Sequence, residues 1–216
     1  MIRRTLAALL GAALYGFSLG SAHSELYASR NLVKFPLLLV TTAAVCATSW
    51  WISARWLNSG LSFRAVQQAT WTLFHDASLL LASASPIVLF FAHVLRATDD
   101  GQLGGYDGFL AWNLGAVALA GVLAFHRQVA RLLRSTELSR RRAVGLAIGW
   151  LALALCVGGQ AAFYMRPFFG FPVTRGNTPP FFLGAEPDAR GATNFFEALA
   201  QAAKRPPLPS TWPSQR

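Results

Sequence analysis

The longest apolar stretch of the sequence, from Ser62 to Arg96, restricts the possible folds of this chain more than any other segment. It exceeds the roughly 20 apolar residues that a helix needs to cross a bilayer. It also contains a histidine, His75, beside a carboxylate, Asp76. Ionisable side chains inside membrane segments are rare and commonly mark functional positions. The stretch therefore predicts a membrane helix and contains the first candidate site.

The composition favours a membrane protein over a soluble one. Of the 216 residues, 54% are hydrophobic and only 13% are charged, whereas soluble domains have about 25% charged residues. The net charge of +10 comes almost entirely from arginine. These arginines flank apolar segments and form no basic stripe with interleaved aromatic residues, so we expect contact with lipid headgroups and no nucleic-acid partner.

Apolar segments separated by short polar connections predict an all-α fold, a polytopic transmembrane bundle of four or five spans. The predicted bundle occupies residues 1–164. We expect a polar connection at residues 23–30 and an aromatic belt that includes Trp50, Trp51 and Trp56. The predicted spans cover residues 5–21, 32–53, 65–95, 106–126 and 143–164.

The first apolar segment has two interpretations. Arg3 and Arg4, the apolar run after them and the small residues near Ala22 have the order of a secretory signal peptide. The small residues Gly11, Gly16 and Gly20 instead suit a retained helix that a neighbouring helix approaches closely. We favour the retained helix because small residues continue along the whole segment.

Positive charges predict the orientation, because loops rich in arginine and lysine stay in the cytoplasm. Ten basic residues fall on one side of the predicted bundle and five on the other. We therefore expect a bacterial inner (cytoplasmic) membrane protein with a cytoplasmic N-terminus and an extracytoplasmic C-terminus. The ten are Arg3, Arg4, Arg55, Arg64, Arg127, Arg131, Arg134, Arg140, Arg141 and Arg142, and the five are Arg30, Lys34, Arg96, Arg166 and Arg175.

Residues 165–216 form a short tail that is rich in aromatic residues and proline. The stretch from Arg166 to Pro172 is expected to lie at the membrane surface. Asn194 and Glu197 have the spacing of a helix-capping pair, which predicts a short interfacial helix at residues 195–204.

Polar residues recur along one face of the central stretch and suggest a site. Adjacent helix residues point about 100° apart, so we expect that His75 and Asp76 form no direct dyad. One interpretation is a proton or ion relay, and the other is that these groups lie near the cytoplasmic boundary, hydrated or paired with Arg64 or Arg127, and only fix helix packing. The stripe comprises Gln68, Thr72, His75, Asp76 and Ser83, with Pro86 beyond it.

Other chemistry has weaker support in the sequence. His75 with His126 and His23 with His93 are arranged as two pairs that suit the axial ligands of b-type haem, although their depths match poorly. Otherwise we expect no cofactor, no metal site and no catalytic residue, since nucleophile, phosphate-loop and paired-cysteine motifs are missing. Cys46 and Cys156 are interpreted as small packing residues.

Four short motifs carry a resemblance. They are residues 34–41 (KFPLLLVT), 84–91 (ASPIVLFF), 166–172 (RPFFGFP) and 194–198 (NFFEA). Together they resemble an uncharacterised family of bacterial multi-pass integral membrane proteins with a loosely Yip1-like bundle. The resemblance implies the fold but no activity, cofactor or catalytic residue, and it does not include His75 and Asp76.

From these observations we expect a non-enzymatic structural or accessory subunit of a larger membrane assembly, with other membrane proteins as partners. Small-residue helix faces and a docking tail suit helix association better than catalysis. The alternative is a small transporter or proton-coupled channel that uses Asp76 and His75. A third possibility is a haem-binding electron carrier.

Overall fold

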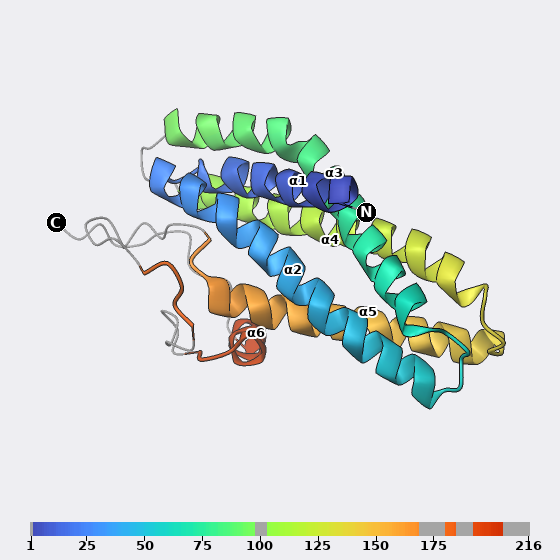
Figure 1. Ribbon diagram of the computed structural model, residues 1–216. Coiled ribbons are helices and arrows are strands. Elements are labelled where there is room, and N and C mark those ends of the chain that lie inside the picture. The colour runs from blue at the N-terminus through green and yellow to red at the C-terminus, as the bar shows by residue number, and fades with distance from the viewer. Residues whose placement is uncertain (1, 98–102, 169–179, 185–191, 205–216) are drawn as a thin grey trace.

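The computed structural model describes residues 2–97, 103–168, 180–184 and 192–204 (Figure 1). These residues form helices and no strand, which confirms the all-α prediction. The helices are α1 (Ile2–Gly20), α2 (Glu25–Trp56), α3 (Phe63–Ala97), α4 (Leu103–Leu133), α5 (Arg140–Met165) and α6 (Phe195–Lys204).

Helix α1 packs closely against both α2 and α3. It forms an antiparallel hairpin with α2, and Gly16 lies against Asn31 and Phe35 of that helix. It runs parallel to α3, whose Ser78 hydroxyl donates a hydrogen bond to the carbonyl of Ala8. The small residues of α1 therefore bring two neighbouring helices close to its backbone.

The buried side chains form two clusters at opposite ends of the bundle. The larger cluster joins the end of α2, the start of α3, the end of α4 and the start of α5, with Trp50 and Trp150 as its largest members. The smaller cluster joins α1, α3 and α4 around Tyr15, whose hydroxyl donates to Asn113 Oδ1 at 2.8 Å. Each end of the bundle thus has its own packed core.

Helix α5 is attached mainly to α2. The Trp50 and Trp150 rings stack with centroids 5.2 Å apart, and each indole N–H donates to the other helix. This burial corrects the expected aromatic belt for Trp50, which belongs to the core, whereas Trp56 is 88% exposed. Helices α4 and α5 meet near their connection and diverge away from it (Figure 1).

Two helices are longer than predicted. Helix α2 begins at Glu25, where Ser24 caps it, so most of the expected connection at residues 23–30 is helical and Pro36 lies in the helix interior. Helix α4 continues through Arg127 and Arg131 to Leu133, so its last turns include part of the arginine-rich segment. In these added turns Arg30 donates to the carbonyl of Pro180, and Gln128 donates to Asp76 of α3.

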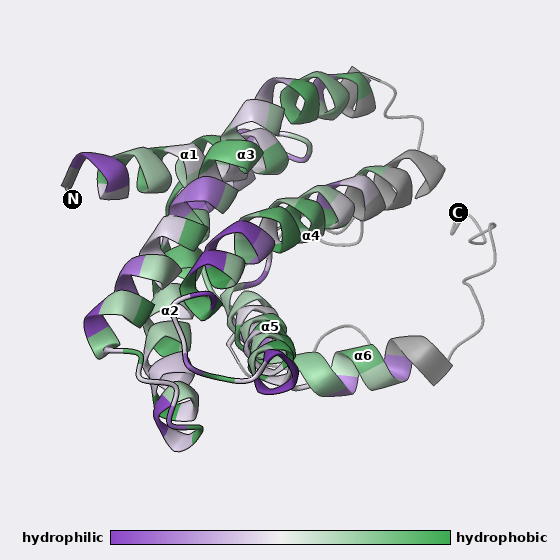
Figure 2. Ribbon diagram, turned by 90° about the vertical axis from the view of Figure 1, so that its right-hand side faces the viewer, coloured by the Kyte–Doolittle hydropathy of each residue, from purple (hydrophilic) through white to green (hydrophobic). Residues whose placement is uncertain are grey.

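Four helices are long and apolar enough to cross a membrane, namely α2, α3, α4 and α5. Helix α1, which carries Arg3 and Arg4, is not among them, although Tyr15 and Leu19 on its inner face are buried. Figure 2 shows hydrophobic residues along the helices and hydrophilic residues at the first turns of α1 and the last turns of α4.

The described parts of the tail fold back onto the bundle. The N–H of Leu183 donates to the carbonyl of Arg166 at 2.9 Å. Helix α6 is capped by Asn194, whose side-chain oxygen accepts from the N–H of Glu197 at 2.9 Å, and Phe195 packs on Gly159 of α5. Residues 169–172 of the expected aromatic surface stretch lie outside the described residues.

Candidate functional site

The polar stripe of α3 is divided between two sides of the helix. Gln68, Thr72 and His75 line a pocket beside α1, whereas Asp76 is turned toward α4. Ser83 is exposed, and its hydroxyl donates to the carbonyl of Leu80 at 2.7 Å. The five residues therefore form no single polar path.

His75 and Asp76 are in direct contact, which corrects the expectation based on their sequence spacing. His75 Nδ1 lies 3.2 Å from Asp76 Oδ1. Their Cα–Cβ bonds diverge by about 100°, but both side chains are long enough to bend toward each other. The prediction that these residues cannot form a direct dyad was therefore wrong.

Asp76 has a second partner on α4. Its Oδ2 accepts a hydrogen bond from Gln128 Nε2 at 2.6 Å, and Gln128 Oε1 accepts from Arg131 at 3.3 Å. Gln128 is buried, while the Asp76 side chain is 28% exposed. The expected partners were Arg64 or Arg127, and Gln128 was missed because the predicted span ended before it.

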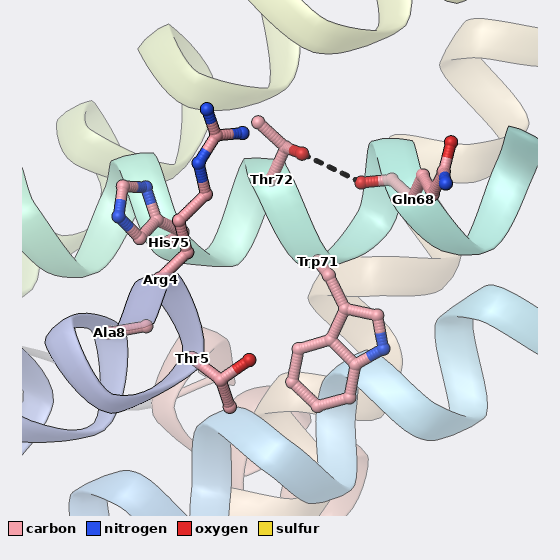
Figure 3. Close-up of a pocket in the computed structure, with 7 residues that line it drawn as sticks. All are labelled: Arg4, Thr5, Ala8, Gln68, Trp71, Thr72 and His75. Atoms are coloured by element: carbon pink, nitrogen blue, oxygen red, sulfur yellow. Dashed lines mark hydrogen bonds between the residues drawn. The ribbon is translucent and has the colours of Figure 1, made fainter. Parts of the chain in front are cut away.

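The pocket beside this cluster lies between α1 and α3. It encloses about 390 Å³. Figure 3 shows the Arg4 side chain extending from α1 toward α3, with His75 and Thr72 nearby and the Trp71 ring on the other side of the opening. Its lining residues are Arg4, Thr5, Ala8, Gln68, Trp71, Thr72 and His75.

A second polar cluster lies near the start of α2, where that helix meets the tail, and it was not predicted from the sequence. Lys34 is fully buried, and its Nζ donates to the carbonyl of Pro167 at 2.7 Å. Three phenylalanine rings surround the ammonium group at 5.1–5.7 Å, in the range of cation–π contacts. These rings belong to Phe168, Phe181 and Phe182.

Asn31 strengthens the same contact between α2 and the tail. Its Nδ2 donates to the carbonyl of Phe168 at 2.7 Å. Its buried Oδ1 has no hydrogen-bond partner within the described parts of the chain. The sequence held one signal, since Lys34 is the only lysine within an apolar segment, but it was used only as a topology charge and as the start of the 34–41 motif.

The four histidines lie in different surroundings. His75 faces the pocket at α1, and His93 lines a separate cavity with Ser21 and Pro86. The ring of His23 packs edge-on against Tyr27, and His126 is exposed. Over the described residues, no group of three or more histidine, cysteine or acidic side chains could hold a metal ion. Haem binding stays a prediction.

The two cysteines also differ. Both are free thiols, but Cys46 is buried in the larger core and Cys156 is exposed on α5. The interpretation as a packing residue therefore fits Cys46 within this chain, but it does not fit the exposed Cys156.

The long apolar helices and their polar ends define a multi-pass α-helical membrane protein. Comparison of the chain with protein-family models, curated proteins and solved structures finds no match. The Yip1-like resemblance therefore stays a prediction.

Proposed function

We propose that this protein is a non-enzymatic structural or accessory subunit of a larger membrane assembly, and that a partner helix packs on α5. The observation that carries this proposal is a face of small residues on α5 that no other part of the described chain covers. The membrane we propose is the bacterial inner membrane, with the N-terminus in the cytoplasm.

Glycines elsewhere in the bundle indicate what such a face is suited for. A Cβ on Gly20 would lie 2.6 Å from the backbone nitrogen of Ala28, and one on Gly11 would lie 3.0 Å from the carbonyl oxygen of Ser78. Contacts this short occur only where helix backbones approach closely. Within membranes, small residues are enriched at such helix–helix interfaces.

Helix α5 has the same kind of face without a neighbour. Gly145 and Gly149 are four residues apart, and a Cβ on either would meet nothing within 4 Å. Ala152 and Cys156 continue the face at three- and four-residue spacing and are exposed as well. Only 17% of the most apolar window of α5 is buried, compared with 28% in each of the other three spans. A second helix would find here both the short approach distance and the uncovered apolar surface that association needs.

The far end of this face already receives a helix of the same chain. A Cβ on Gly159 would lie 2.6 Å from the ring of Phe195, so α6 rests directly on the α5 backbone. The N–H of Phe195 donates to Gln160 Oε1 at 3.1 Å. Because α6 covers only this end, the surface around Gly149 is left for a partner.

Co-purification from the native membrane in mild detergent, followed by mass spectrometry, tests this proposal. We expect a stable partner with the unmodified chain and its loss in Gly149→Leu, which fills the face. Gly115→Leu on α4 is the matched control, since Gly115 is also exposed with nothing within 4 Å. If the unmodified protein is recovered alone, or both variants keep the partner equally, the proposal fails.

Cys156 provides a direct measurement on the same face. We expect oxidative or bifunctional cross-linking in intact membranes to join Cys156 to the partner, whereas the buried Cys46 should give no adduct. Failure of Cys156 to give any adduct beside a co-purified partner would place the contact elsewhere on the chain.

A second candidate function is supported by the His75–Asp76 contact. The two groups, with Gln128 and Arg131, form a chain of hydrogen-bonding side chains between α3 and α4. We propose as the alternative a small proton-coupled transporter or channel that uses Asp76 and His75. Asp76→Asn should then abolish transport or shift its pH dependence, and unchanged flux would exclude the relay.

A further inference from the structure

The pocket between α1 and α3 has a polar wall whose Arg4 and Gln68 side chains take no part in the contacts between helices described above. It lies where α1 begins, beside residues 68–75 of α3. Its polar wall comes from both helices, with Arg4 on one side and Gln68 and His75 on the other (Figure 3). This juxtaposition of a cation, an amide and an imidazole suits an anionic group.

We propose that this pocket binds the phosphodiester headgroup of an anionic phospholipid. The inference requires that the chain lies in a membrane and does not depend on the partner proposed for α5. Basic pockets between membrane helices on the cytoplasmic side are suited to the headgroups of acidic lipids.

Charge in the pocket favours an anion. Arg4 presents up to five N–H donors in a planar fork that matches two phosphate oxygens. Asp76 lies 3.2 Å from His75 on the same helix but is turned toward Gln128 of α4, so its carboxylate does not line the pocket. No carboxylate is among the described residues that line the pocket. Arg4 therefore gives the lining of the pocket its positive charge.

The other polar side chains of the lining differ in whether they can donate hydrogen bonds to a ligand. The Thr72 hydroxyl donates to the carbonyl of Gln68 at 2.8 Å, so it offers the ligand only lone pairs (Figure 3). Gln68 and Trp71 also line the pocket, and both side chains carry N–H donors. A phosphodiester, whose oxygens accept hydrogen bonds, suits such a lining.

The surroundings of the pocket favour a lipid over a soluble anion. Trp71 is a side chain of the type enriched at the membrane–water interface, and α3, which carries it, is long and apolar enough to cross a membrane. A headgroup held at Arg4 would leave its acyl chains beside the apolar part of α3.

The test compares lipids with identical acyl chains on the full chain in non-ionic detergent. Binding of dioleoyl phosphatidylglycerol and of dioleoyl phosphatidylcholine is measured by native mass spectrometry at raised ionic strength. Arg4→Gln is compared with Arg3→Gln, which removes the same charge from an exposed neighbour that does not line the pocket. Circular dichroism of each lipid-free variant verifies that it is folded.

We expect the unmodified chain to prefer phosphatidylglycerol, and Arg4→Gln to weaken that binding about fivefold more than Arg3→Gln. Gln68→Leu should also weaken it, because it removes a donor without changing the charge. Equal losses in the two arginine variants, or equal binding of the two lipids, would overturn the proposal. Displacement of phosphatidylglycerol by millimolar inorganic phosphate would overturn the lipid assignment and indicate a site for a soluble anion.

Discussion

Replacing Gly16 by alanine should loosen the contact between α1 and α2. The new Cβ would lie 2.9 Å from Phe35 Cβ and nearer still to the carbonyl oxygen of Asn31. Carbon atoms pack best at about 3.5–4.0 Å, so α1 must move by roughly 0.6 Å or more. That movement disturbs the hydrogen bond from Tyr15 to Asn113, since α1 is fixed from both sides.

The expected change in the free energy of unfolding follows from two opposing effects. Overpacking a close contact costs about 1–3 kcal/mol, whereas alanine in place of glycine stabilises a helix by about 1 kcal/mol. The second effect is shared by Gly115→Ala on α4, where a Cβ meets nothing within 4 Å. The difference between the two variants therefore isolates the packing cost, and we expect Gly16→Ala to be less stable than Gly115→Ala by about 1–3 kcal/mol.

The buried thiol of Cys46 provides the assay. In a Cys156→Ala background, a thiol-reactive fluorophore reports unfolding, because Cys46 is fully buried in the folded chain. For a chain of this size the expected difference in Tm is about 2–12 °C. Equal Tm values for the two variants would refute the close packing of α1, and the intact mass of the purified protein shows whether α1 was present during the measurement.

Three further predictions use contacts between distant parts of the chain. Tyr15→Phe should destabilise the fold by about 0.5–1.5 kcal/mol, since it removes the donor to Asn113, while Tyr164→Phe at an exposed position should not; the Cys46 assay measures both. Trp150→Phe should lower the free energy of unfolding by about 1–3 kcal/mol, because it removes the indole stack on Trp50 and the 2.7 Å hydrogen bond to Ser53. An equal loss of stability in the control Trp56→Phe, measured in the same assay, would contradict this prediction. Lys34→Met should release residues 180–184 from α2 and speed tryptic cleavage of the tail, with Arg64→Met as control; an unchanged cleavage rate would show that Lys34 does not hold the tail.

The sequence was sufficient to predict the helical class, because apolar length and arginine placement are local properties. It also contained the cap of α6, since Asn194 and Glu197 are only three residues apart. It did not reveal the partner of Asp76, because Gln128 is 52 positions away and follows a predicted span end. Pairing between helices depends on how the bundle packs, which periodicity within one helix does not specify.

The start of α2 illustrates the same limit. Arg30 ends the stretch that was predicted as a polar connection, and Asn31 and Lys34 follow it closely, yet all three lie within α2. Each of them contacts the carbonyl groups or rings of the tail segments at residues 166–168 and 180–182. Polar residues are tolerated in this helix because a segment more than 130 positions away satisfies them. The tail therefore provides the partners for the polar side chains in the first part of α2.

These contacts leave α5 with two fixed ends and an open middle. One end is tied to α2 by the Trp50–Trp150 stack, and the other leads directly into Arg166 and Pro167, whose carbonyls are bound by Leu183 and Lys34. Between these points the outward face of α5 carries Gly149 and Cys156 without a neighbour. A helix held at both ends presents such a face in a fixed orientation. Binding of a partner would therefore cost little conformational entropy in α5. Releasing the tail with Lys34→Met should therefore weaken partner binding at Gly149 even though Lys34 lies outside that face.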